Sequence, residues 1–315
     1  MYHRKDIPLN KKRHHHHTSG KRHHHLKKHL GLKIFLGIVV LLLVVAGAVG
    51  YSVYSSVNST FKSSYEKMPL TTATDLKKSN AFTTLLIETG TLNNQKACFA
   101  TVLTATNKAT NQATFLNIPV SDVLPNQETI NSIYASGGEK GVIQYVKSTF
   151  GVDINKVVNV NIDKIGTFIE ATGGISLQNP KAFVSNGYEF KQGTIHLVTA
   201  EQVQAYISKV DHSDINAAIT RIQNVSMGLY SNLQEVAHVK KIKSVNYYRQ
   251  LLYAYTETVR TNIDFGEFKS IVLNYNKALQ NTSKLNLHAS TVNNIKVIPQ
   301  SEIDSNKKLF AEALK

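Results

Sequence analysis

The stretch TVLTATNKATNQATFLNI, residues 101–118, decides the fold. Its two ends, 101–106 and 113–118, are short and rich in β-branched residues, and a polar segment of hairpin length, 107–112, joins them. β-Branched residues fit a pleated, half-buried surface, and a short polar loop between two such runs is typical of a β-hairpin. Residues 101–118 therefore predict two adjacent strands.

Strands and helical segments alternate on either side of this hairpin. Residues 85–88 and 157–162 are rich in β-branched and aliphatic side chains and predict two more strands. Apolar residues recur at helical spacing from 142 to 150, with Gly151 in a C-cap position, and a second helix is expected over 164–172. We therefore predict an α/β fold in which helices cover both faces of a central mixed β-sheet.

The longest helix is predicted from about Asp214 to Leu233. Asp214 suits the N-cap or the first turn of this helix. Arg221 falls at the edge of the apolar stripe, two turns above Asp214, where it can reach water or the lip of a cleft. The stripe follows the 3.6-residue period and consists of Ile215, Ala218, Ile219, Ile222, Val225, Leu229 and Leu233.

The last part of the chain predicts three further helices and a strand pair. Two helices share residues 244–280, and Asp264 can start the second of them. Weak alternation over 285–298 indicates a strand pair, and 301–314 indicates a closing helix. We expect these elements to pack on or beside the preceding core.

An uncharged run of 20 residues, 34–53, follows 33 residues that hold ten Lys or Arg against one acid, Asp6. About 20 apolar residues cross the hydrocarbon core as a helix, and basic flanks stay on the cytoplasmic side. We therefore predict a single-pass cell-membrane protein with a cytoplasmic N-terminus and an extracytoplasmic C-terminal domain. A signal peptide cleaved near residues 46–48 is the alternative, but the apolar region of such peptides is usually only about 7 to 15 residues long.

Most of the positive charge lies before the membrane run. Of the formal net charge of +15, +9 falls in residues 1–33, where two histidine clusters stand among Lys and Arg. This composition predicts contact with anionic lipid headgroups, and at most adventitious metal binding by the histidines. The outer part keeps only +6, so the sequence gives little support to nucleic-acid binding.

The number of cysteines and the spacing of the histidines argue against disulfide bonds and a zinc site. The single cysteine, Cys98, excludes an internal disulfide framework and a cysteine-rich zinc site. Four histidines share no ligand spacing, so we assign no metal site: His196, His212, His238 and His288. Stability must therefore come from an apolar core.

The predicted organisation has five parts. They are a basic cytoplasmic tail (1–33), a transmembrane helix (34–53), an extracytoplasmic stalk (54–80), a core domain (81–235) and a C-terminal segment of helices and a strand pair (236–315).

Several pieces of sequence occur in a recognisable order. They are LNIP (116–119), NSIYASGG (131–138), TGGI (172–175) before Pro180, FKQG (190–193) followed by Leu197, Glu201, Gln202 and Tyr206, and RIQ (221–223). This order and spacing, over about 81–233, resembles the LytR-CpsA-Psr family, as does the single amino-terminal anchor.

The resemblance implies a protein on the outer face of a Gram-positive membrane. Members of the family transfer anionic glycopolymers, such as wall teichoic acid or capsule, from a polyprenyl-pyrophosphate carrier to peptidoglycan. The resemblance also implies several arginines and a magnesium ion held by aspartates around the pyrophosphate, because negative charge builds there during transfer. A hydrophobic tunnel for the lipid is implied between the sheet and the helices.

The chain departs from the family pattern at the charged positions. Asp122 lies one position after the place of the usual aspartate, and no arginine occurs between Arg22 and Arg221. A pyrophosphate site built from several forked guanidinium groups is therefore excluded, since lysine replaces arginine only as a point charge. The positions at which aspartates or arginines are usual hold Gly90, Ala100, Val120, Ser121, Ser208, Val210 and Ala218.

Four residues remain as candidates for phosphate or substrate binding: Arg221, Lys209, Asp122 and Asp214. Arg221 is either a remnant phosphate contact or a structural arginine that pairs with Asp214 or the sheet edge. Lys209 either contacts phosphate or projects into water, and Asp122 either caps a turn or binds metal. We assign no catalytic residue and no cofactor, and Mg²⁺ is expected only if the protein is active.

We expect a degenerate family member, with weak or no transferase activity, that binds lipid-linked glycopolymer, peptidoglycan or a sister enzyme of the family. The alternative is a divergent but active phosphotransferase in which Lys140, Lys147, Lys181 or Lys209 replaces the missing arginines. A third hypothesis is a transcriptional attenuator that acts through the basic tail, which shows no helix-turn-helix pattern.

Overall fold

The computed structural model describes residues 51–209, 215–238 and 244–315. The cytoplasmic tail, nearly all of the expected membrane helix and Asp214 lie outside these residues. Among the helices within the described ranges, none is long and apolar enough to cross a membrane.

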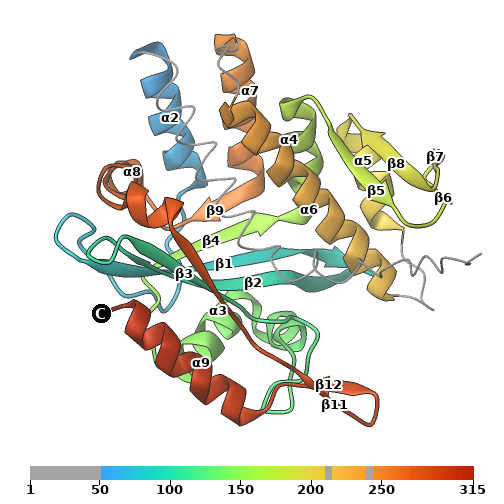
Figure 1. Cartoon of the computed structure of the whole chain (residues 1–315). Coiled ribbons are helices and arrows are strands. Elements are labelled where there is room, and N and C mark those ends of the chain that lie inside the picture. The colour runs from blue at the N-terminus through green and yellow to red at the C-terminus, as the bar shows by residue number, and fades with distance from the viewer. Residues whose placement is uncertain (1–50, 210–214, 239–243) are drawn as a thin grey trace, which may run out of the picture.

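A six-stranded sheet forms the centre of the molecule (Figure 1). Its order is β10-β3-β2-β1-β4-β9. The three central strands pair antiparallel, β4 runs parallel to β1, β10 runs parallel to β3, and β9 closes the far edge antiparallel to β4. The predicted mixed sheet is thus confirmed. The strands are β1 (Ala81–Leu92), β2 (Gln95–Asn107), β3 (Gln112–Asn117), β4 (Lys156–Asn161), β9 (Val259–Thr261) and β10 (Thr282–Asn286).

The hairpin of residues 101–118 forms as predicted. β2 and β3 pair in register from Val102 opposite Asn117 to Asn107 opposite Gln112. The side chain of Asn107 stabilises the turn, because its Oδ1 accepts hydrogen bonds from the main-chain N–H groups of the two residues at 109 and 110. β2 begins six residues earlier than expected, since its first half pairs with the end of β1.

Helices cover both faces of the sheet (Figure 1). One face carries α3 (Ile130–Phe150) and α9 (Gln300–Ala313). The other face carries the remaining helices: α2 (Tyr51–Ser64), α4 (Ile165–Thr172), α5 (Ala200–Ser208), α6 (Ile215–His238), α7 (Val245–Thr258) and α8 (Phe265–Gln280).

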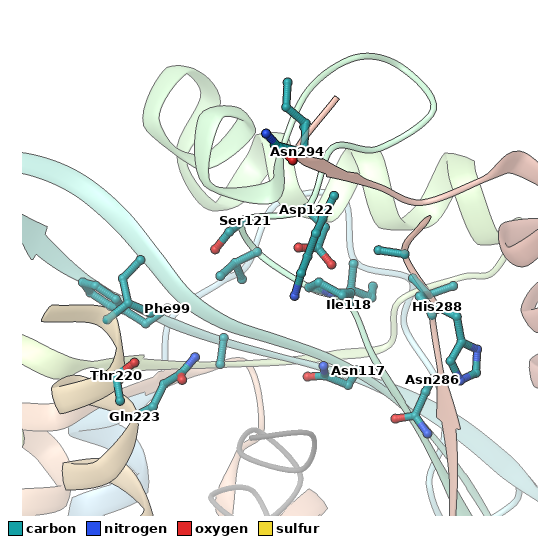
Figure 2. Close-up of a pocket in the computed structure, with 18 residues that line it drawn as sticks. Phe99, Asn117, Ile118, Ser121, Asp122, Thr220, Gln223, Asn286, His288 and Asn294 are labelled. Carbon is teal, nitrogen blue, oxygen red and sulfur yellow. The ribbon is translucent and has the colours of Figure 1, made fainter. Parts of the chain in front are cut away.

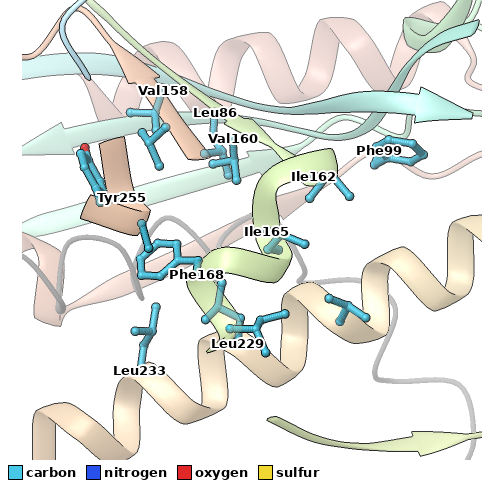
Figure 3. Packing of buried hydrophobic residues seen from close by; sticks show 14 of the residues in the cluster. Leu86, Phe99, Val158, Val160, Ile162, Ile165, Phe168, Leu229, Leu233 and Tyr255 are labelled. Carbon is cyan, nitrogen blue, oxygen red and sulfur yellow. The ribbon is translucent and has the colours of Figure 1, made fainter. Parts of the chain in front are cut away.

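Alternation along β1 divides the apolar interior into two clusters. Leu85 and Ile87 point into the cluster beneath α3 and α9. Phe82 and Leu86 point into the opposite cluster, where α4 and α6 contribute Phe168 and other apolar side chains (Figure 3). Successive side chains of a strand point to opposite faces, so a strand covered on both sides is apolar throughout instead of alternating with polar residues.

Helix ends agree with the predicted caps. Gly151 ends α3 in the left-handed conformation, with φ of 63°, which favours a residue without a Cβ. Gly173 ends α4 in the same way, and Asp264 accepts a hydrogen bond from the N–H of Glu267 at the start of α8. α3 begins at Ile130, before the apolar periodicity that starts at residue 142. The two parts differ in pattern because Gly138 has a non-helical backbone, which kinks the helix.

Three small two-stranded sheets and one short helical turn complete the fold, and the sequence periodicity did not identify most of them. β5 (Ile175–Asn179) pairs with β8 (Gly193–Leu197), β6 (Phe183–Ser185) with β7 (Tyr188–Phe190), and β11 (Ser290–Val292) with β12 (Ile295–Val297). A 3-10 turn, η2 (Ile162–Lys164), leads from β4 into α4.

The segments that flank the expected core pack on the sheet. The predicted stalk, 54–80, contains most of α2, whose Val57 and Phe61 are buried, and the Phe61 ring stacks on Phe268 of α8 at 4.7 Å. The first part of the predicted stalk is thus helical and lies against the helices that cover the sheet. From the C-terminal segment, 236–315, β9 and β10 enter the central sheet as its two edge strands.

Replacement of Leu85 by alanine should destabilise the fold. Leu85 is fully buried in β1, so Leu85→Ala should lower the free energy of unfolding by about 2–5 kcal/mol through lost apolar contacts and a cavity. Leu273 of α8 is 75 % exposed, and Leu273→Ala should change it by less than about 0.5 kcal/mol. Chemical denaturation of the detergent-solubilised chain, followed by circular dichroism, measures both; similar losses for the two variants would contradict the assigned burial.

Candidate functional site

A cleft of about 970 Å³ opens at one end of the central sheet, where strands finish (Figure 2). It lies where β3 and β10 end, beside the first half of β2, the first half of α6 and the β11–β12 hairpin. Because β3 and β10 are parallel, their carboxyl ends lie side by side at the same end of the sheet. The lining consists of Phe99, Ala100, residues 117–122, Ile219, Thr220, Gln223, residues 286–289 and residues 294–296.

Main-chain hydrogen bonds fix the wall of the cleft that follows β3. The N–H of Ile118 donates to the carbonyl of Thr101, and the carbonyl of Val120 accepts from the N–H of Asn131 at the start of α3. Val123 then bonds to the β11–β12 hairpin, by donating to the carbonyl of Lys296 at 2.8 Å. The hairpin and α3 thereby hold residues 117–122 against the cleft.

The lining is rich in amide and hydroxyl groups and poor in charge. Among the described residues, permanent charge in the lining comes from Asp122 and Lys296. Burial raises the pKa of the Asp122 carboxyl, and the nearby Lys296 opposes this shift. His288 is paired with Glu302, whose Oε2 lies 3.1 Å from its Nδ1. Amides and hydroxyls both donate and accept hydrogen bonds, so the cleft suits a neutral polar ligand better than a bare phosphate.

The structure separates the predicted site residues. Asp122 lines the cleft, whereas Arg221 and Lys209 are not among its lining residues. Arg221 is buried beneath α5: its Nε donates to the carbonyl of Tyr206 at 3.2 Å and its Nη2 to the carbonyl of Lys209. Its guanidinium also stacks on the ring of Phe183, 4.9 Å from the centroid.

The lysines considered as replacements for arginine lie away from the cleft lining. Lys147 pairs with Asp153 at 2.9 Å near the end of α3. Lys140 on α3, Lys181 and Lys209 are exposed, and none of them lines the cleft as the structure describes it. The lysine that does line it, Lys296, was not a sequence candidate.

Glu88 was missed at the sequence level. Its side chain is fully buried on β1, in register with Ala100 of β2 and Val160 of β4. Burial raises the pKa of its carboxyl to about 8, and neither carboxyl oxygen has a hydrogen-bond partner within the described part of the chain. The signal that points to it is a lone acid within a run of apolar and threonine residues.

A second carboxylate occupies the space beside Gly90. A Cβ at Gly90 would lie 2.9 Å from Oδ1 of Asp163, so the Asp163 carboxyl fills the space that a side chain at 90 would need. Asp163 accepts hydrogen bonds from both the N–H and the hydroxyl of Thr91. It therefore ties η2 to the end of β1.

The described residues do not form a magnesium site by themselves. Within these ranges no group of three or more His, Cys, Asp or Glu side chains could hold a metal ion. Among the described residues, Asp122 is the carboxylate that lines the cleft, whereas Glu88 is fully buried on β1 and does not line it. Mg²⁺ demands octahedral oxygen coordination, so these separated carboxylates do not fit it.

Comparison with known proteins gives one family and a consistent set of relatives. The family described as LytR_cpsA_psr matches residues 55–312. A polyisoprenyl-teichoic acid–peptidoglycan teichoic acid transferase TagU of Halalkalibacterium halodurans is 29 % identical over 180 residues, which cover 56 % of this chain and 58 % of that relative. The TagU of Enterococcus faecalis is 26 % identical over 262 residues, which cover 79 % of this chain and 85 % of the relative.

Solved structures share the fold. The crystal structure of TagV from B. subtilis has a TM-score of 0.52 at 20 % identity, covering 75 % of this chain and 98 % of that one. A protein from Streptococcus agalactiae gives 0.54 at 18 % identity, covering 76 % and 89 %. At these identities the likeness extends to the fold alone.

Glu88 should make stability depend on pH. A carboxyl with a raised pKa binds its proton more tightly in the folded than in the unfolded state, so the free energy of unfolding should fall as pH rises from about 5 to about 8. The slope contributed by Glu88 is at most about 1.4 kcal/mol per pH unit. Glu88→Gln, neutral at every pH, should remove this slope in denaturation curves, whereas exposed Glu189→Gln should keep it. An unchanged slope in Glu88→Gln would refute the buried carboxyl.

Arg221 should behave as a structural residue. Arg221→Ala removes the donor to the carbonyls of Tyr206 and Lys209, so the free energy of unfolding should fall by about 1–3 kcal/mol. Arg221→Lys should recover only part of this loss because an ammonium lacks the planar fork. Arg249→Ala, at an exposed position of α7, is the control. If Arg221→Ala unfolds like the unmodified chain, the structural assignment is wrong.

Proposed function

The chain belongs to the LytR-CpsA-Psr family, as its motifs predicted, and on that premise we propose that it attaches a polyprenyl-linked anionic glycopolymer to peptidoglycan as a divergent phosphotransferase. The observation that carries this proposal is the extent of the match. It runs from 55 to 312 and so includes every residue that lines the cleft. The curated relatives that match most of the chain carry the name of a teichoic acid transferase.

The cleft has the size and the position for such a substrate. Ligand sites usually enclose about 300–1,000 Å³, and this cleft has about 970 Å³. Lys296 offers one cation there, and Asp122 offers a carboxylate. A lysine can neutralise phosphate charge only as a point charge, so we expect slow transfer compared with a site of several arginines.

A second candidate function is binding without transfer, in a degenerate family member. The composition of the cleft favours it, since the positions 100, 120 and 121 line the cleft with Ala, Val and Ser where the family resemblance implies charged residues. Such a protein would hold lipid-linked polymer, peptidoglycan or a sister enzyme in place without chemistry.

The lipid would enter between the sheet and the helices. In this structure the gap between β4 and α6 is filled by side chains that include Val160, Phe168 and Leu229 (Figure 3), and the cavity left there has a volume of only about 10 Å³. Room for about one water molecule does not admit a polyprenyl chain. A polyprenyl chain that enters at this point would require α6 to move away from α4 and β4.

Membrane anchoring belongs to the same proposal. The uncharged run 34–53 would hold the domain of 55–312 on the outer surface, within reach of lipid carriers whose headgroups lie at that surface. The basic residues before it would remain on the cytoplasmic side.

A reconstituted transfer assay tests the proposal. The full chain in lipid vesicles is supplied with polyprenyl-pyrophosphate-linked teichoic acid and peptidoglycan, with and without Mg²⁺, and covalent attachment of polymer to peptidoglycan is measured. We expect transfer above the protein-free rate. Ser121→Arg places a guanidinium at an exposed position of the cleft and should raise the rate at least about tenfold, because charge stabilisation dominates such reactions.

Val184→Arg on the exposed β6–β7 hairpin adds the same charge away from the cleft and should leave the rate unchanged. Polymer that binds without transfer would support the second candidate. A chain that neither transfers nor retains lipid-linked polymer would refute both.

A further inference from the structure

Helices α2 and α7 pack against each other and run in the same direction (Figure 1). Each has 14 residues, and each leads into the region of β9. Tyr65, the residue after α2, forms a parallel bridge with Thr261 of β9, and the N–H of Glu66 donates to the carbonyl of Thr261 at 2.8 Å. Because the two helices share their length, direction and end point, they begin at nearly the same level.

Aromatic packing makes α2 part of the domain. The Phe61 ring lies 6.2 Å from the ring of Tyr255 in α7 and 4.7 Å from that of Phe268 in α8. Val57 and Phe61 are buried in the same apolar cluster as Leu251 of α7. Full burial of one such side chain is worth about 1.5–3 kcal/mol, so α2 does not act as a flexible linker. The direction of α2 therefore sets the direction of the whole domain.

The start of α7 lies at the level where the predicted membrane run ends. That run, 34–53, ends inside α2, which begins at Tyr51. Phe61 and Tyr255 are packed together, and position 53 precedes Phe61 by eight residues just as Tyr247 precedes Tyr255. At about 1.5 Å per residue, Tyr253 lies about 9 Å further out than Tyr247, and Glu257 about 15 Å. The headgroup layer on each side of a bilayer is only about 5–8 Å thick.

The exposed residues at the start of α7 suit this layer. Arg249 and Gln250 are exposed, and Tyr253 is 62 % exposed. Residues 244–256 contain no Asp or Glu, and the first acid, Glu257, falls beyond the headgroup layer. Helical side chains tilt toward the start of their helix, so the Tyr253 ring points toward the membrane side. Tyrosine is enriched at the membrane–water interface, and arginine binds phosphate through its planar fork.

We propose that the first three turns of α7, residues 245–254, dock on the outer headgroup layer of the bilayer as a second membrane contact beside the anchor. The inference rests on the membrane anchoring that is part of the proposed function. Arg249 pairs with lipid phosphates, and Tyr253 lies at the boundary with water. The domain is thereby held in one orientation, with the β11–β12 hairpin beside the cleft at the end opposite the starts of α2 and α7 (Figure 1).

Tryptophan fluorescence of the full chain in vesicles tests the orientation, because the sequence contains no tryptophan. Gln250→Trp, Tyr253→Trp and Glu257→Trp place a reporter on one exposed stripe of α7, and Val292→Trp places it on the exposed β11–β12 hairpin as the control. A nitroxide on the lipid headgroup is the quencher. We expect quenching to fall from 250 to 257, by at least about twofold, and to be absent at 292, since each residue adds about 1.5 Å along the helix. Equal quenching at all four positions would mean that the domain swings freely on its anchor, and would overturn the proposal.

Charge reversal tests the contact itself. In vesicles of phosphatidylcholine with about 30 % phosphatidylglycerol, Arg249→Glu should lower the thermal unfolding midpoint by at least about 2 °C more than it does in pure phosphatidylcholine, because anionic headgroups attract arginine and repel glutamate. Lys140→Glu makes the same charge change on α3, on the other face of the sheet, and should give equal midpoints in both vesicles. Equal shifts for Arg249→Glu in the two vesicles would refute the headgroup contact.

The outcome is separable from that of the transfer assay. If the chain transfers polymer but shows no quenching gradient along α7, the proposed function stands and the second membrane contact is refuted. If the gradient is found and no transfer occurs, the contact is supported and the phosphotransferase proposal fails. A chain that does not float with the vesicles would refute both the anchor and the contact.

Discussion

Burial of β1 on both faces is the constraint on which the rest of the structure depends. β1 pairs with β2 on one edge and β4 on the other, and helices cover it above and below. A shift of one residue in its register would exchange the side chains of the two clusters. Because β1 carries buried residues on both faces, its register depends on the pairing with β2 and β4. One consequence is at Glu88, which has no hydrogen-bond partner among the described residues and whose pKa burial raises to about 8.

The site follows from the topology of this sheet. β3 and β10 are parallel, and β2 is antiparallel to β3. The last residues of β3 and β10 and the first residues of β2 therefore lie at the same end of the sheet. The β11–β12 hairpin and α3 hold the segment after β3, and α6 closes the opposite wall. Residues as distant in sequence as Ala100, Gln223 and Lys296 thereby line one space.

The described side chains of that cleft differ from the arginines and aspartates that the family resemblance implies around a pyrophosphate. Amide and hydroxyl side chains outnumber charged ones in the described lining of the cleft. Arg221 lies elsewhere, where main-chain carbonyls and the Phe183 ring hold it. A cleft of this composition favours recognition of sugar hydroxyls over stabilisation of a transferring phosphate.

The sequence alone determined the hairpin of 101–118, the mixed sheet, the helix ends at Gly151, Gly173 and Asp264, and the family. Each depends on local signals: β-branched runs, helical periodicity, residues that tolerate left-handed or capping geometry, and the order of short motifs. The sequence also placed Arg221 at the edge of the apolar stripe of α6. Which residues Arg221 contacts depends on how α5 packs on α6.

Only the tertiary structure decided which polar residues meet. Lys296 carries no local pattern that marks it, because it meets residues 117–122 only through the packing of the β11–β12 hairpin on the segment after β3. The packing of α2 on α8 and the entry of β9 and β10 into the sheet are long-range in the same way. Periodicity indicates which side of a helix or strand is apolar. The packing of the whole chain determines which other helix or strand covers that side.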